Sequence, residues 1–145
     1  MKRMYLSCIV IILLFALILM LSGCGAITDE AQITSVINGF FQAISDRDWD
    51  TARSYCVYDS VAYNDVTDWE EEWNNDFGES EEWDLIFVVD DINPIIVSGN
   101  YAEAYTYSSI FLYYNGEILE EESESTEAWL YLQKIDSDWK LYDSY

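Results

Sequence analysis

The sequence predicts an α+β domain in which N-terminal helices pack on a curved antiparallel sheet. Apolar residues recur at helical spacing up to Gly78, and the pattern then alternates as it does in strands. The turn dipeptides Gly99-Asn100 and Asn115-Gly116 separate long β-rich stretches and are typical of hairpins. Helices followed by sequential strands favour this layered arrangement, and the absence of repeats or linkers indicates one domain.

The first residues have the pattern of an export signal rather than of the domain. Lys2 and Arg3 precede an apolar run from Tyr5 to Met20, and Leu21-Ser22-Gly23-Cys24 follows. These four residues resemble the lipobox of bacterial and some archaeal lipoproteins. We therefore expect a signal peptide over 1–23, lipid on Cys24, a tether over 24–28 and a domain over 29–145. An uncleaved transmembrane anchor is the alternative. In either case the domain would lie outside the cytoplasm, at the cell surface or on the periplasmic side.

The sequence predicts three helices. Thr28 or Asp29 caps the first, whose apolar face is Ile33, Val36, Ile37, Phe40, Phe41 and Ile44. Asp48 caps a second, with Trp49, Ala52, Tyr55 and Cys56 inside. Residues 57–66 are expected to be irregular. The third helix is expected to begin at Thr67 or Asp68, with Trp69, Trp73 and Phe77 packed in the core.

The strands follow from alternation and from turn residues. The predicted β segments are 84–90, 92–97, 101–114, 126–135 and 139–145. Pro94 cannot donate a hydrogen bond to a neighbouring strand, so it marks an edge or a bulge. Gly39, inside the first helix, indicates close packing.

The two longest strands would have two different faces, because successive side chains point in opposite directions. One face has small and aliphatic residues and is assigned to the core, with Thr106 and Ser108 as the polar groups of any internal pocket. The other face is aromatic, and such residues dominate binding hot spots. It is the candidate surface for a homodimer or for a protein or glycan partner, formed by Tyr105, Tyr107, Phe111, Tyr113, Trp129 and Tyr131.

Charge and composition exclude several functions. The chain has 28 acidic and 6 basic residues, which disfavours binding to nucleic acid. It has no histidine, and neither acidic stretch, 70–82 or 120–124, has the ligand spacing of a calcium loop. The sequence therefore predicts no metal site and no cofactor. Cys56 would be the single cysteine left in the domain, with no histidine to activate it.

The predicted domain resembles the nuclear transport factor 2-like superfamily, which includes SnoaL-like and ketosteroid isomerase-like proteins. The resemblance covers nearly all of the predicted domain and depends on three segments in order. These are the first helix with Asp46-Arg47-Asp48-Trp49 after it, the strand start Asn100-Tyr101-Ala102-Glu103-Ala104, and the final strands with Asp138-Trp139-Lys140-Leu141. The resemblance implies a cone-shaped α+β fold. It transfers no catalytic residue to this sequence.

The family includes enzymes, small-molecule binders and protein-binding modules, so fold alone does not decide function. The sequence favours a non-catalytic, membrane-anchored module that binds a ligand or a protein. The alternative is an enzyme or binder of the isomerase-like type, in which a carboxylate with a raised pKa lies in an apolar pocket. Asp59, Asp65 and Asp90 are the candidates for that carboxylate.

Overall fold

The computed structural model describes residues 28–78, 82–119 and 124–144, so Cys24 and the predicted signal peptide lie outside the described residues. Within these described ranges, three helices come first: α2 (Asp29–Ser45), α3 (Trp49–Ser54) and α4 (Val61–Asp76). The strands follow: β1 (Trp83–Ser98), β2 (Tyr101–Tyr114), β3 (Glu117–Ile118), β4 (Glu124–Ile135) and β5 (Asp138–Ser144). This order confirms the predicted α+β class. Within the described residues, no helix is long and apolar enough to cross a membrane.

Two helix starts agree with their predicted caps. The Thr28 hydroxyl accepts a hydrogen bond from the Ala31 amide at 3.2 Å, and the Asp48 carboxylate accepts one from the Thr51 amide at 3.1 Å. These bonds satisfy amides that have no partner inside the helix. On α2, the predicted apolar face is buried except for the partly buried Val36.

The predicted start of the third helix was wrong. α4 begins at Val61 rather than at Thr67 or Asp68, and Ser60 caps it by accepting a hydrogen bond from the Tyr63 amide at 3.2 Å. Ala62 and Val66 are buried one turn apart, which extends the apolar face toward the N-terminus. The polar residues Asn64 and Asp65 lie between these two positions and concealed their helical spacing.

The sheet is antiparallel with the strand order β1-β2-β4-β5, and the short β3 pairs with β2. The two predicted β segments 84–90 and 92–97 are one continuous strand, β1. Its register against β2 shifts between Val89 and Asp91 and again between Ile92 and Ile95, where Pro94 lies. Pro94 is therefore at a bulge in an edge strand, as its missing N–H requires.

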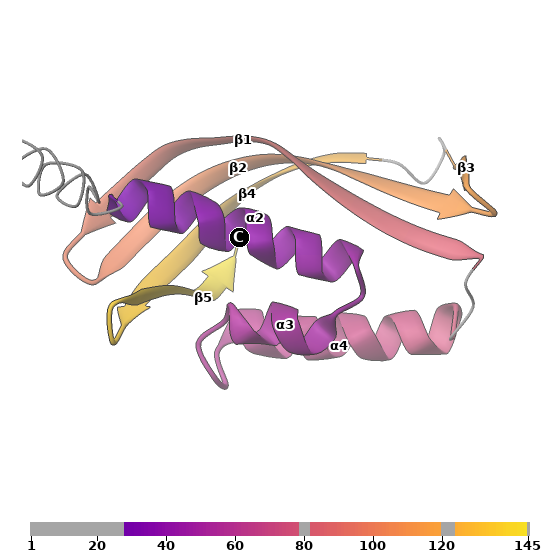
Figure 1. The fold of residues 1–145 in the computed structure, drawn as a ribbon, viewed down its shortest axis with the longest axis horizontal. Helices are drawn as coiled ribbons and strands as arrows, with labels where there is room; N and C mark the ends of the chain where they lie inside the picture. Colours follow the sequence, from indigo (N-terminus) through magenta and orange to yellow (C-terminus); the bar gives the residue numbers. More distant parts are fainter. Residues whose placement is uncertain (1–27, 79–81, 120–123, 145) are drawn as a thin grey trace, which may run out of the picture.

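The helices cover one face of the sheet. Figure 1 shows the strands curving over α2, with α3 and α4 on the other side of that helix and the ends of β1 and β2 extending beyond all three. The sheet contributes buried side chains to a core shared with α2, namely Ala102, Ala104, Leu130, Leu132, Trp139 and Leu141. The small, aliphatic face of β2 and β4 is thus the face that the helices cover.

Asp29 fastens the first turn of α2 to the last two strands. Its Oδ1 accepts hydrogen bonds from Lys134 Nζ at 2.6 Å and from Trp139 Nε1 at 3.0 Å. The bond from Lys134, followed by the bond from Trp139, lowers the pKa of Asp29 below its ordinary value of 3.8. The described domain is therefore fixed to its sheet from its first helical residue.

Candidate functional site

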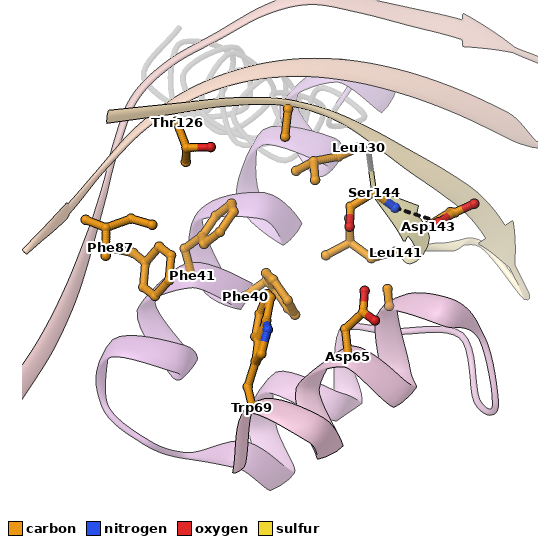
Figure 2. Close-up of a pocket in the computed structure, with 13 residues that line it drawn as sticks. Phe40, Phe41, Asp65, Trp69, Phe87, Thr126, Leu130, Leu141, Asp143 and Ser144 are labelled. Carbon is orange, nitrogen blue, oxygen red and sulfur yellow. Dashed lines mark hydrogen bonds between the residues drawn. The ribbon is translucent and has the colours of Figure 1, made fainter. Parts of the chain in front are cut away.

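A cavity of about 320 Å³ lies between α2, α4 and the covered face of the sheet. We call it the first cavity, and Figure 2 shows the side chains around it. Its volume is within the range of small-molecule sites. It is lined by Phe40, Phe41, Ala62, Asp65, Trp69, Phe87, Ile110, Thr126, Ala128, Leu130, Leu141, Asp143 and Ser144.

Aromatic rings form much of the wall of the first cavity. The Phe41 ring stacks on Phe87 with 5.4 Å between ring centroids, and it meets Phe40 edge-on at 5.3 Å. The ring centroids of Phe40 and Trp69 are 6.5 Å apart. Trp69 is 38% exposed, so the predicted core role of the α4 aromatic residues applies to the buried Trp73 but not to Trp69. Trp69 instead contributes a ring to the cavity mouth.

Asp65 is the carboxylate that lies among these apolar side chains. Figure 2 shows Asp65 and Trp69 extending from α4 toward Phe40 and Leu141, with Asp143 at the edge of the cavity. Burial is the main cause that raises the pKa of Asp65 above its ordinary value of 3.8, and the charges of Asp68 and Asp143 raise it further. A carboxylate in this setting can accept a hydrogen bond or a proton from a ligand.

The other two predicted carboxylates lie elsewhere. Asp59 occupies the turn before α4 with a φ of 60° and is exposed. Asp90 is exposed on β1, where it accepts a hydrogen bond from the Ser109 hydroxyl at 2.7 Å. Of the three, only Asp65 lines the first cavity, and its position on α4 follows from the earlier start of that helix.

Thr106 and Ser108 are buried on the covered face, but neither lines the first cavity. The Thr106 hydroxyl donates a hydrogen bond to the Ala128 carbonyl at 3.2 Å, and the Ser108 hydroxyl has no partner among the described residues. Thr126, which pairs with Ser108 across the strands, is the threonine that lines the cavity. The alternation of side chains along a strand assigns each residue to one face of the sheet. It does not show where along the strand the helices leave a cavity.

The environment of Cys56 disfavours its reactive thiolate form. Its side chain is buried, and its Sγ lies 3.6 Å from the Ala52 carbonyl, to which it donates a weak hydrogen bond. Burial raises the pKa of the Cys56 thiol to about 12, against the opposing charge of Lys140. The thiolate, which is the reactive form, is therefore scarce at neutral pH.

A second cavity of about 320 Å³ lies next to the first, beneath β1 and β2 at the C-terminal end of α4. The two cavities share Trp69, Phe87 and Ile110 in their linings, so Trp69 stands between them. The second cavity is lined by Ile44, Trp49, Trp69, Glu72, Trp73, Asp76, Phe77, Leu85, Phe87, Ile110 and Leu112.

The opposite face of the sheet carries a cluster of aromatic side chains, which we call the open face. The Tyr105 ring lies 5.0 Å from Trp129 and 5.1 Å from Tyr107. The Tyr105 hydroxyl donates a hydrogen bond to Glu127, and this bond raises the pKa of Tyr105 to about 12. Tyr107 is exposed, and the other members of the predicted surface are partly buried: Tyr105, Phe111, Tyr113, Trp129 and Tyr131.

No protein-family model matches the sequence, and no curated protein matches it either. Solved structures do match the described fold. A nuclear transport factor 2-like protein of unknown function from Pseudomonas putida is 16% identical with a TM-score of 0.61, and the match covers 79% of this chain and 82% of that one. A second such protein, from Prochlorococcus, is 16% identical with a TM-score of 0.59, covering 81% and 90%.

A third match shows that the same fold occurs within an enzyme complex. The β subunit of benzoate 1,2-dioxygenase from Burkholderia mallei is 9% identical with a TM-score of 0.63, covering 83% of this chain and 90% of that one. At these identities the likeness concerns the fold. The domain has the nuclear transport factor 2-like fold, as the resemblance implied.

Proposed function

We propose that this chain, a nuclear transport factor 2-like domain by its fold, is a lipid-anchored extracytoplasmic protein that binds a small apolar molecule in the first cavity. The observation that carries the proposal is a cavity of about 320 Å³ whose wall is mainly aromatic and aliphatic and includes a half-buried carboxylate, Asp65. Apolar pockets with a few placed polar groups are the usual form of small-molecule sites.

The anchor follows from the N-terminal sequence. Lipid on Cys24 would hold the domain at a membrane surface, since buried acyl chains contribute about 0.8 kcal/mol for each CH₂ group. The interval from Cys24 to the first helical residue, Asp29, is short, so the domain would lie close to that surface. The wild-type protein is expected to incorporate a labelled fatty acid, and Cys24→Ser is expected not to. A wild-type protein that took up no label would indicate an uncleaved transmembrane anchor instead.

The ligand that fits best has a ring or branched apolar body and a hydrogen-bond donor. Phe40, Phe41 and Phe87 offer ring surfaces to such a body, and Asp65 offers a charged acceptor to a hydroxyl or amine. Hydrogen bonds to charged groups contribute about 1.5–3 kcal/mol, so Asp65 would discriminate between ligands with and without a donor.

The test compares p-cresol with toluene, which has the same ring and methyl group but no hydroxyl. The full chain would be held in nanodiscs and titrated while the indole N–H signals of its 6 tryptophans are followed by NMR. We expect p-cresol to shift the Trp69 signal and to bind about tenfold more tightly than toluene. Asp65→Asn should remove that preference and leave toluene binding unchanged.

Three substitutions on β4 test the position of the site, two inside the cavity and one matched control outside it. Ala128→Trp places a large side chain in the first cavity and should abolish binding of both ligands, and Thr126→Phe should weaken both. Ser125→Trp places the same ring on the exposed side of the strand and should change neither. If the Ser125 variant lost binding as fully as the Ala128 variant, the site would not be the first cavity.

A non-catalytic role is favoured because the chain has no histidine and its domain cysteine is a buried thiol. The raised pKa of Asp65 favours one second candidate, an enzyme that uses this carboxylate as a general base. Such an enzyme would exchange the methyl protons of acetophenone for deuterium in heavy water, and Asp65→Asn would stop the exchange. An unchanged methyl signal in the wild-type protein would support binding alone.

A further inference from the structure

The second cavity combines aromatic walls with acidic groups at its edge. Trp69, Glu72, Trp73 and Asp76 follow each other at helical spacing, so one side of α4 presents two indole rings and two carboxylates to the same space. Phe77 continues this surface, with its ring centroid 4.6 Å from that of Trp73. Trp49 and Phe87 complete the aromatic part of the lining from α3 and β1.

The charge around the second cavity is negative. Glu72 and Asp76 are exposed at the rim, no basic residue lines the cavity, and the ion pairs found among the described residues use other carboxylates. Arg47 lies nearby, with its Cζ 5.5 Å from the Trp73 ring centroid, and it pairs with Asp84 at 3.5 Å. Arg47 therefore already covers one face of the Trp73 indole, and a cation in the cavity would meet the rings of Trp69 and Trp49 instead.

We propose that the second cavity binds a small alkylammonium ion, such as a quaternary amino alcohol. The faces of tryptophan rings attract such cations, and N-methyl groups bury apolar surface against them. Glu72 and Asp76 add a negative potential, and the net charge of −22 raises the local concentration of cations.

The experiment titrates the full chain with choline and with 3,3-dimethylbutan-1-ol, a neutral molecule of the same shape in which carbon replaces nitrogen. Nanodiscs of phosphatidylglycerol are used because they contain no choline headgroup. The readout is again the indole N–H signals, with Trp73 assigned through the Trp73→Phe variant. We expect choline to shift the Trp69 and Trp73 signals and to leave Trp129, on the open face, unchanged.

Three comparisons decide the result. The neutral alcohol should bind about tenfold more weakly than choline. The double variant Glu72→Gln plus Asp76→Asn should weaken choline binding by about tenfold and leave the alcohol unaffected. Glu71→Gln, an exposed acid on the same helix that does not line the cavity, is the matched control and should change neither.

Equal binding of choline and the alcohol, or no shift of the Trp73 signal by choline, would overturn the proposal. The two proposals can fail separately, because Asp65 lines the first cavity and not the second. Asp65→Asn should therefore alter p-cresol binding and leave choline binding as it is. If Glu71→Gln weakened choline binding as well, the overall charge of the protein would explain the effect of the double variant. That result would also refute the site.

Discussion

At the scale of single residues, Asp65 has the clearest chemical consequence. Its pKa in the folded protein is raised above the ordinary value of 3.8, mainly by burial, so the folded state holds this proton more tightly than the unfolded state does. Stability is therefore lost as the pH rises through the window from 3.8 to the folded pKa, and ionised Asp65 is destabilising at neutral pH. We expect Asp65→Asn to be more stable than the wild type at neutral pH.

This gain should disappear below the ordinary Asp pKa, because the carboxyl is then protonated in both states and resembles the amide. Urea unfolding at neutral pH and at a pH below 3.8 measures the difference. Glu71→Gln, on the same helix and exposed, serves as the control and should change little at either pH. A variant less stable than the wild type at neutral pH would contradict the burial of a charged Asp65.

At the scale of elements, Gly39 leaves room on α2 for the ring of Tyr55, the residue that ends α3. A Cβ built on Gly39 would lie 2.6 Å from Tyr55 Cζ, well inside contact distance. In an unobstructed helix interior, alanine is about 1 kcal/mol more favourable than glycine. At this position, overpacking of about 1–3 kcal/mol opposes that gain, so Gly39→Ala should lower the free energy of unfolding.

The sign of the effect should reverse when the ring is removed. In a Tyr55→Leu background, Gly39→Ala is expected to raise the free energy of unfolding by up to about 1 kcal/mol. Denaturant unfolding of the four proteins in this cycle measures the coupling between the two residues. If Gly39→Ala stabilised the protein with Tyr55 present, the Tyr55 ring would not lie as close to Gly39 as described above.

At the scale of the whole molecule, the open face remains a predicted interaction surface. It combines the exposed Tyr107 with neighbouring apolar side chains on β1, including Val88, which is 41% exposed. Surfaces rich in tyrosine and tryptophan favour association. We expect the full chain to form a dimer in detergent, measured by analytical ultracentrifugation, and expect Tyr107→Ser plus Trp129→Ser to make it monomeric.

The control for this substitution is Tyr58→Ser, which removes a tyrosine that is 81% exposed in the turn before α4. This variant should stay dimeric. A monomer in all three proteins would rule out self-association through the open face and leave that face to a protein or glycan partner. The charge of −22 would oppose association most strongly at low salt, where screening is weakest.

Local patterns were sufficient for most of the fold. The caps at Thr28 and Asp48, the turns at Gly99 and Asn115, and the alternation along β2 each depend on residues close together in the chain. Local patterns gave the wrong start for α4, where Asn64 and Asp65 interrupted the apolar spacing. They also divided β1 into two strands, because a bulge interrupts its alternation.

The sequence by itself determined the α+β class, the order of the elements, the two faces of the sheet and the excess of acid. It also included Asp65 among three candidate carboxylates. Only the tertiary structure decided which carboxylate lies in a cavity, because that depends on the space left between α4 and the sheet. It also placed Trp69 between two cavities instead of in the core. Side-chain periodicity specifies direction, whereas a cavity arises from the separation of elements that are far apart in the chain.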